Sequence, residues 1–114
     1  MCRLITLLRK KKSLKAVEWC EGSDIMLRDT VRMMNSKDYK ERFKAEYYQT
    51  KIRFEKLKAF NARIEAANKT RNQDNKVSMP EHDCPEKLLL MQQRIMAEYL
   101  HILEVRAIIE RIDL

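Results

Sequence analysis

Apolar residues recur at alternating steps of four and three positions in two long segments of this chain, residues 36–64 and 85–114. The first set is Phe43, Tyr47, Thr50, Phe54, Leu57, Asn61 and Ile64. The second set is Leu88, Met91, Ile95, Ile102, Val105, Ile109 and Ile112, with Glu98 interrupting it. Because residues three and four apart share one face of a helix, each set predicts a helix with an apolar stripe. Two such helices joined by a polar connection predict an antiparallel helical hairpin.

The composition supports an all-α fold. The 114 residues include one Gly and two Pro, and 36% of them are charged, whereas strands and tight turns would need more Gly and β-branched alternation. We expect a basic N-terminal extension over residues 1–34, with one or two short helices. A helical-hairpin domain should follow over residues 35–114, with a helix at about 36–67, a polar connection at 68–83 and a helix at about 84–113.

Both expected helices have start signals. Asn35 or Ser36 can cap the first helix by accepting a hydrogen bond from an unpaired backbone N–H. In the second helix Asp83 can act as the cap, Pro85 suits the first turn and Glu86 completes the spacing of a capping box.

The second helix carries more apolar residues than a two-helix hairpin can cover. A further stripe consists of Leu89, Met96, Leu100, Leu103 and Ala107. Since a hairpin covers only one of the two stripes, the other should contact the N-terminal segment or another copy of the chain. We expect a homo-oligomer, with Leu89, Met96, Leu100 and Leu103 at its interface.

The chain is basic, with a formal net charge of +7, and residues 37–63 carry nine Lys or Arg against four Asp or Glu. This segment would attract an anionic partner such as a nucleotide, a nucleic acid or an acidic protein, although a solvated lysine-rich face is the alternative. An aromatic ring can stack on a base while a nearby cation neutralises a phosphate. The candidate ligand-binding residues are Tyr39, Lys44, Tyr48, Lys51 and Arg53, whereas Tyr47 falls on the apolar stripe and is expected in the core.

The sequence offers little for catalysis. One Gly cannot build a phosphate-cradling loop, so no catalytic residue and no cofactor is predicted. His82, Asp83 and Cys84, with His101 later in the chain, lack the second spaced pair of a tetrahedral metal site, and no metal is expected. Three cysteines without paired spacing suit a reducing cytoplasm. The apolar stretch at residues 4–8 is too short to cross a membrane, so we expect a soluble intracellular protein.

Residues 1–34 allow two interpretations. Met33 and Met34 directly precede the first long helix, so translation could start there and the preceding segment would be an optional extension. Alternatively, the segment forms an accessory helix whose Ile25, Met26 and Val31 cover the open end of the hairpin.

Three stretches of the chain, residues 53–60, 84–89 and 96–106, resemble small helical-hairpin proteins of crAss-like and related phages. These proteins are similar to the hairpin of the phage anti-CBASS sponge family, which sequesters cyclic oligonucleotide signals made by bacterial defence enzymes. The resemblance covers about residues 35–114. It implies an oligomer of hairpins in which aromatic rings stack on bases and cations meet the phosphates of a cyclic di- or trinucleotide.

The sequence thus leads to the hypothesis of a phage anti-defence protein that binds and sequesters cyclic oligonucleotides without catalysis, in the cytoplasm of the bacterial host. The alternative is an inhibitor of the anti-CRISPR type, which binds a host defence protein or nuclease. A DNA-binding protein without sequence preference is a further alternative, and its affinity should fall steeply with salt.

Overall fold

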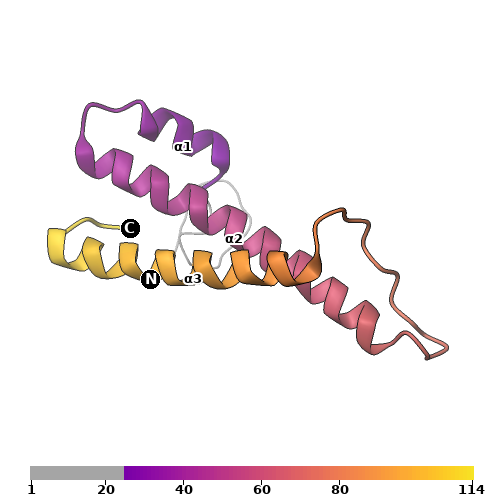
Figure 1. Cartoon of the computed structure of the whole chain (residues 1–114). Coiled ribbons are helices and arrows are strands. Elements are labelled where there is room, and N and C mark those ends of the chain that lie inside the picture. Colours follow the sequence, from indigo (N-terminus) through magenta and orange to yellow (C-terminus); the bar gives the residue numbers. More distant parts are fainter. Residues whose placement is uncertain (1–24) are drawn as a thin grey trace. The chain divides into compact units, whose positions relative to one another are not determined.

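The computed structural model describes residues 25–114, and within this range it contains three helices and no strand. They are α1 (Leu27–Met34), α2 (Tyr39–Lys69) and α3 (Glu86–Glu110), as Figure 1 shows. The prediction of an all-α fold is confirmed for these residues. The expectations for residues 1–24 lie outside the described range.

The described chain divides into two compact units. The first consists of residues 25–49 together with 111–114, and the second consists of residues 50–110. The division falls inside α2, so that the first part of this helix belongs to one unit and its remainder to the other.

In the first unit, hydrogen bonds stabilise α1 and connect it to α2. The carboxylate of Asp29 accepts a hydrogen bond from the backbone N–H of Met26 at 2.9 Å, which satisfies a donor at the start of the helix. The hydroxyl of Thr30 donates to the carbonyl of Leu27 at 2.6 Å and accepts from the Gln49 amide at 3.0 Å. Thr30 is completely buried, and these two bonds satisfy its hydroxyl.

The first turn of α2 is capped by Asp38. Its carboxylate accepts a hydrogen bond from the backbone N–H of Lys40 at 3.1 Å, and the Ser36 hydroxyl accepts one from the N–H of Asp38 at 3.0 Å. The helix therefore begins at Tyr39, later than a cap at Asn35 or Ser36 would place it. Ser36 supports the capping residue instead of being one.

In the second unit, the end of α2 and the start of α3 contact each other in antiparallel order. The side-chain amide of Asn61 donates to the Leu89 carbonyl at 3.2 Å and to the Gln93 side chain at 2.8 Å. The amide of Asn68 donates to the carboxylate of Glu86 at 3.0 Å. Asn68 follows Asn61 along α2, whereas its partner Glu86 precedes Leu89 and Gln93 along α3, so the two helix segments are antiparallel.

The connection between α2 and α3 is also held by a hydrogen bond, because the Thr70 hydroxyl accepts from the Val77 backbone N–H at 2.9 Å. At the start of α3 the Pro85 carbonyl accepts from the N–H of Leu89 at 3.2 Å. The carboxylate of Asp83 makes no hydrogen bond among the described residues, so the predicted capping contact is absent.

Burial on α3 reverses the roles that the sequence suggested for its two stripes. Leu100, Leu103 and Ala107 are buried, and Leu89 and Met96 are half-buried. Six members of the stripe that was expected to face the rest of the chain are exposed, whereas the seventh, Ile112, lies beyond the end of α3 and is buried. We call these six the α3 outer stripe: Leu88, Met91, Ile95, Ile102, Val105 and Ile109. Exposure ranges from 1% at Leu103 to 72% at Ile109, so the α3 outer stripe is the more open of the two, and the interface of Leu89, Met96, Leu100 and Leu103 stays a prediction.

Candidate functional site

The structure distributes the five predicted ligand-binding residues over different environments. Tyr48 is buried, and its ring meets that of Tyr47 edge to face with the centroids 5.1 Å apart. Tyr39 is exposed, and its ring lies 6.2 Å from that of Phe43. Stacking on a ligand requires an open ring face, which the buried position of Tyr48 does not offer.

The same five residues do not share one face of α2. At about 100° per residue, Lys44, Tyr48 and Lys51 lie within about 60° of one another around the helix axis. Tyr39 and Arg53 lie on the opposite side. Binding by the whole set therefore stays a prediction, and the site is better sought among residues on a single face.

A different set on α2 has that property. Arg53, Lys56, Phe60 and Arg63 follow one another at steps of three, four and three, within the second unit. We call this set the basic stripe. Its three cations are exposed, Phe60 is half-buried and no acidic residue interrupts the sequence of steps. Among the described residues, neither Arg53 nor Lys56 forms an ion pair, so an anion could approach these charges without breaking one.

Neighbouring side chains position the aromatic ring of the basic stripe. The guanidinium carbon of Arg63 lies 5.6 Å from the centroid of Phe60, within the range of a cation–π interaction. The imidazole of His82 meets Phe60 edge to face, with the centroids 6.0 Å apart and the planes at 89°. His82 is itself placed by Pro80, whose carbonyl lies 2.8 Å from Nδ1, and by Glu86, whose carboxylate lies 3.7 Å from Nε2. The connection between the helices thus supports the basic stripe.

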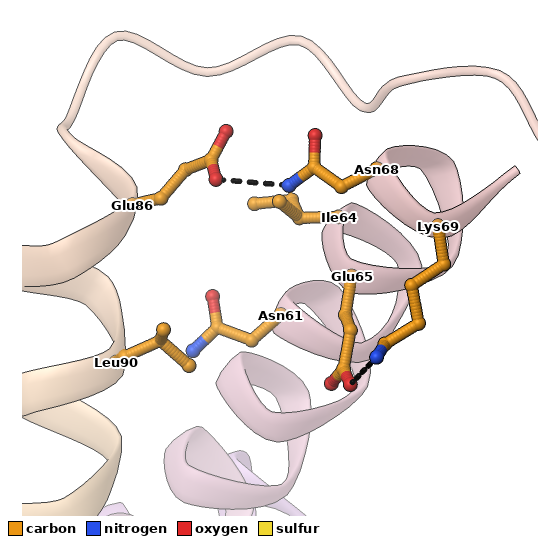
Figure 2. A pocket seen from close by; sticks show the side chains of 7 residues that line it. All are labelled: Asn61, Ile64, Glu65, Asn68, Lys69, Glu86 and Leu90. Atoms are coloured by element: carbon orange, nitrogen blue, oxygen red, sulfur yellow. Dashed lines mark hydrogen bonds and ion pairs between the residues drawn. The ribbon is translucent and has the colours of Figure 1, made fainter. Parts of the chain in front are cut away.

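A pocket of about 390 Å³ lies between α2 and α3 in the same unit. It is lined by Asn61, Ile64, Glu65, Asn68, Lys69, Glu86 and Leu90 (Figure 2). Figure 2 shows Asn68 reaching toward Glu86, while the Glu65–Lys69 ion pair, at 3.7 Å, lies to one side. Two carboxylates against one ammonium make the lining acidic, which disfavours a phosphate.

The described part of the chain was also compared with the requirements of a metal site and of a membrane-spanning helix. No group of three His, Cys, Asp or Glu side chains in residues 25–114 could hold a metal ion. The candidates His82, Asp83 and Cys84 do not form such a group, and Cys84 is a half-buried free thiol. None of the three helices combines the length and the apolar character that a membrane crossing requires.

Of the basic stripe, the predicted ligand-binding set contains only Arg53, and Phe60 was expected off the apolar stripe as a candidate for a second contact with another copy or a flat ligand. Lys56 and Arg63 were not predicted, because aromatic and basic residues close together in sequence can lie on opposite sides of a helix. The three-four-three spacing of the basic stripe was visible in the sequence and would have identified the set.

The family model described as Sequestin matches residues 37–109, which is more than half of the 114 residues. This range contains all of α2, including the basic stripe, and all but the last residue of α3. Searches of curated proteins and of solved structures found no match.

Proposed function

Because the chain belongs to the Sequestin family, we propose that it is a binding protein that sequesters a cyclic oligonucleotide and leaves it chemically unchanged. The family's name indicates sequestration. The cyclic oligonucleotide comes from the resemblance to the phage sponges, and with it come a role against bacterial defence and a location in the host cytoplasm. The ligand class, the role against bacterial defence and the location are therefore all proposed.

The basic stripe is the observation that carries the proposal. Residues 50–69 of α2 hold six basic against two acidic residues, and three of the basic ones line up with Phe60 on one face. A phosphate is attracted by the guanidinium groups of Arg53 and Arg63 and by the ammonium of Lys56. Phe60 adds an apolar surface beside these charges on which a base can pack.

The length of the basic stripe favours a ligand with more than one phosphate. Arg53 and Arg63 are ten residues apart, which corresponds to about 15 Å along the helix. Single phosphates are too small to contact both ends of such a row. A cyclic dinucleotide or trinucleotide carries two or three phosphates on one rigid ring, and rigidity lowers the entropy lost on binding.

The proposal is tested by titration calorimetry of the full chain with a panel of cyclic di- and trinucleotides. We expect at least one of them to bind, and at a free ligand concentration 100 times Kd it should stabilise the fold by about 2.7 kcal/mol. After heat denaturation of the complex, chromatography with mass detection should recover the ligand intact. Absence of binding across the panel, or recovery of a cleaved product, would contradict the proposal.

The role of the basic stripe in this binding has its own control. Reversing the charge of Lys56 should weaken binding, whereas the same change at Lys58, two positions along α2, should not. Lys58 is also exposed, but its ammonium lies over the ring of Phe54 at 6.0 Å, away from the basic stripe. Lys44, Lys51, Tyr39 and Tyr48 stay candidates for additional contacts, to be substituted in the same assay.

The α3 outer stripe favours a second candidate function. Contiguous apolar surface on a helix is typical of a protein-binding face. An inhibitor of the anti-CRISPR type could use it to bind a host defence protein or nuclease. Capture from host lysate, with Ile95→Lys as the control bait, distinguishes this function from ligand sequestration.

A further inference from the structure

The pocket between α2 and α3 contains a buried hydrogen-bond acceptor that nothing uses. The side-chain nitrogen of Asn61 donates to the backbone carbonyl of Leu89 and to Gln93. Because a carbonyl can only accept, this contact fixes which way the amide faces. The Asn61 oxygen lies on the other side and accepts no hydrogen bond from the described residues, although Asn61 is only 6% exposed. In Figure 2 this oxygen points toward Ile64 and Glu86.

A buried acceptor without a donor is unfavourable, so the Asn61 oxygen favours a pocket occupant that donates hydrogen bonds. The pocket is also the right size for a small molecule. Its volume of about 390 Å³ lies within the range of known ligand sites.

The charges of the lining narrow the kind of occupant. Glu65 is paired with Lys69 at 3.7 Å, so its charge is balanced within the chain. Glu86 has no Lys or Arg partner among the described residues. One of its oxygens accepts from the Asn68 amide and the other lies 3.7 Å from Nε2 of His82. Since a carboxylate offers about four acceptor positions, Glu86 can accept further hydrogen bonds.

The remaining part of the lining is apolar. Ile64 contributes an aliphatic side chain from α2, and Leu90 contributes one from α3. Ile64 is buried, whereas Leu90 is 54% exposed, so a hydrocarbon chain that covers Leu90 would remove apolar surface from water. The pocket thus combines acceptors, one carboxylate without a Lys or Arg partner and an apolar wall.

We propose that this pocket binds a small aliphatic ammonium ion. Its N–H groups donate to the Glu86 carboxylate and to the Asn61 oxygen, and its hydrocarbon chain packs on Ile64 and Leu90. An ammonium group has three donors and no acceptor, which matches a lining with unused acceptors. This inference does not rest on the proposed nucleotide, because the basic stripe and the pocket have no residue in common.

Other classes of small ligand match the pocket less well. An anion would meet two carboxylates at short range, which is unfavourable. A neutral alcohol has a single donor and brings no charge to the carboxylate of Glu86, whereas hydrogen bonds between two charged groups are roughly twice as strong as neutral ones. Affinity for an amine should therefore exceed affinity for an alcohol of the same length.

Nuclear magnetic resonance of the isotopically labelled full chain at neutral pH tests the proposal. The probe is n-pentylamine, which is protonated there because alkylamines titrate near pH 10, like lysine. We expect saturable shifts at the Asn61 and Asn68 side-chain amides and at the Leu90 methyl groups, with Kd in roughly the millimolar range. The uncharged control ligand, 1-pentanol, should bind at least about tenfold more weakly.

Two glutamates of α3 provide matched variants. Glu86→Gln removes the charge but keeps an acceptor for Asn68, and it should weaken binding of n-pentylamine about tenfold or more. Glu98 is exposed and does not line the pocket, so Glu98→Gln should change the affinity by no more than about twofold. The amide spectrum of each variant verifies that the fold is retained.

Equal affinities for n-pentylamine and 1-pentanol would overturn the proposal, because they would assign binding to apolar contact alone. So would the absence of saturable shifts up to about 100 mM amine, a concentration that would detect even weak binding. These two results need no variant and hold even if Glu86→Gln fails to fold. Equal losses in Glu86→Gln and Glu98→Gln would also overturn it, by showing general attraction to carboxylates.

Discussion

The basic stripe of α2 and the α3 outer stripe belong to the same unit and follow the same three-four spacing, yet their chemistry is opposite. The basic stripe places Arg53, Lys56 and Arg63 in water around one aromatic ring. The α3 outer stripe places aliphatic side chains in water with Glu98 as the one charge among its repeat positions. Helical spacing thus groups side chains on one face, whereas the chemistry of those side chains determines which kind of partner the face can bind.

The largest expected effect distinguishes the buried face of α3 from its outer stripe. Leu103→Ala should lower the free energy of unfolding by about 2–5 kcal/mol, because Leu103 is 1% exposed and its loss leaves a cavity. Its neighbour Ile102 is 54% exposed and serves as the control. Ile102→Ala should cost less and, if the second copy binds there, its cost should depend on protein concentration in thermal or chemical unfolding. Equal, concentration-independent losses for both variants would contradict the division of α3 into two faces.

The next effect concerns the polar contact that joins the two helices of this unit. Asn61→Ala removes the donor to the Leu89 carbonyl and to the Gln93 side chain, and it should lower the free energy of unfolding by about 1–3 kcal/mol in urea denaturation. Ligand affinity should stay unchanged, since Asn61 is not part of the basic stripe. An Asn61→Ala variant as stable as the wild type would show that these hydrogen bonds contribute nothing net.

A smaller effect compares two lysines on different faces of α2. Lys56→Glu should weaken binding of the cyclic oligonucleotide about tenfold or more, because it replaces attraction to a phosphate with repulsion. Lys58→Glu should change the affinity by no more than about threefold, because Lys58 lies off the basic stripe and salt screens its interaction with a ligand bound there. Titration calorimetry measures both. Similar losses in the two variants would indicate general attraction by a positive surface and not a site at the basic stripe.

The smallest effect lies at the end of α3, outside both stripes. Arg111 adopts a positive φ of 60°, a region that disfavours residues with a Cβ, and its carbonyl accepts a hydrogen bond from the Lys40 ammonium at 3.3 Å. Arg111→Gly should raise the free energy of unfolding by about 0.5–1 kcal/mol, whereas Arg111→Ala should bring no gain. Thermal unfolding of the two variants side by side checks this, and a gain in the alanine variant would assign the effect to the lost charge.

Much of the helical architecture was predictable from the sequence. Spacing indicated both long helices, and the ends of the predicted segments lie within a few residues of Tyr39–Lys69 and Glu86–Glu110. The stripe from Phe43 to Ile64 is buried or half-buried at every member, and Asn61 makes the interhelical contact that a polar residue in such a stripe suggests. Periodicity succeeds here because one face of α2 carries the pattern.

Periodicity could not choose between the two faces of α3, because both carry an apolar repeat. Which one is buried depends on the side chains that cover it, and a single sequence does not contain that information in its spacing. The predicted ligand-binding set combined two faces of α2 for a related reason: Arg53 stands close to Lys44, Tyr48 and Lys51 in sequence, but proximity along a helix does not place residues on one face. Tyr48 is buried as a result of packing that its sequence neighbours do not reveal.

Sedimentation velocity of the full chain, mixed with the panel of cyclic oligonucleotides and followed at the absorbance of the nucleotide bases, tests self-association and ligand binding in one experiment. One ligand should sediment with a protein species of at least twice the mass of one chain. The Lys56→Glu variant should keep that protein mass but release the ligand. A protein that sediments as one chain, with every nucleotide left in the slow free fraction, would contradict both self-association and sequestration.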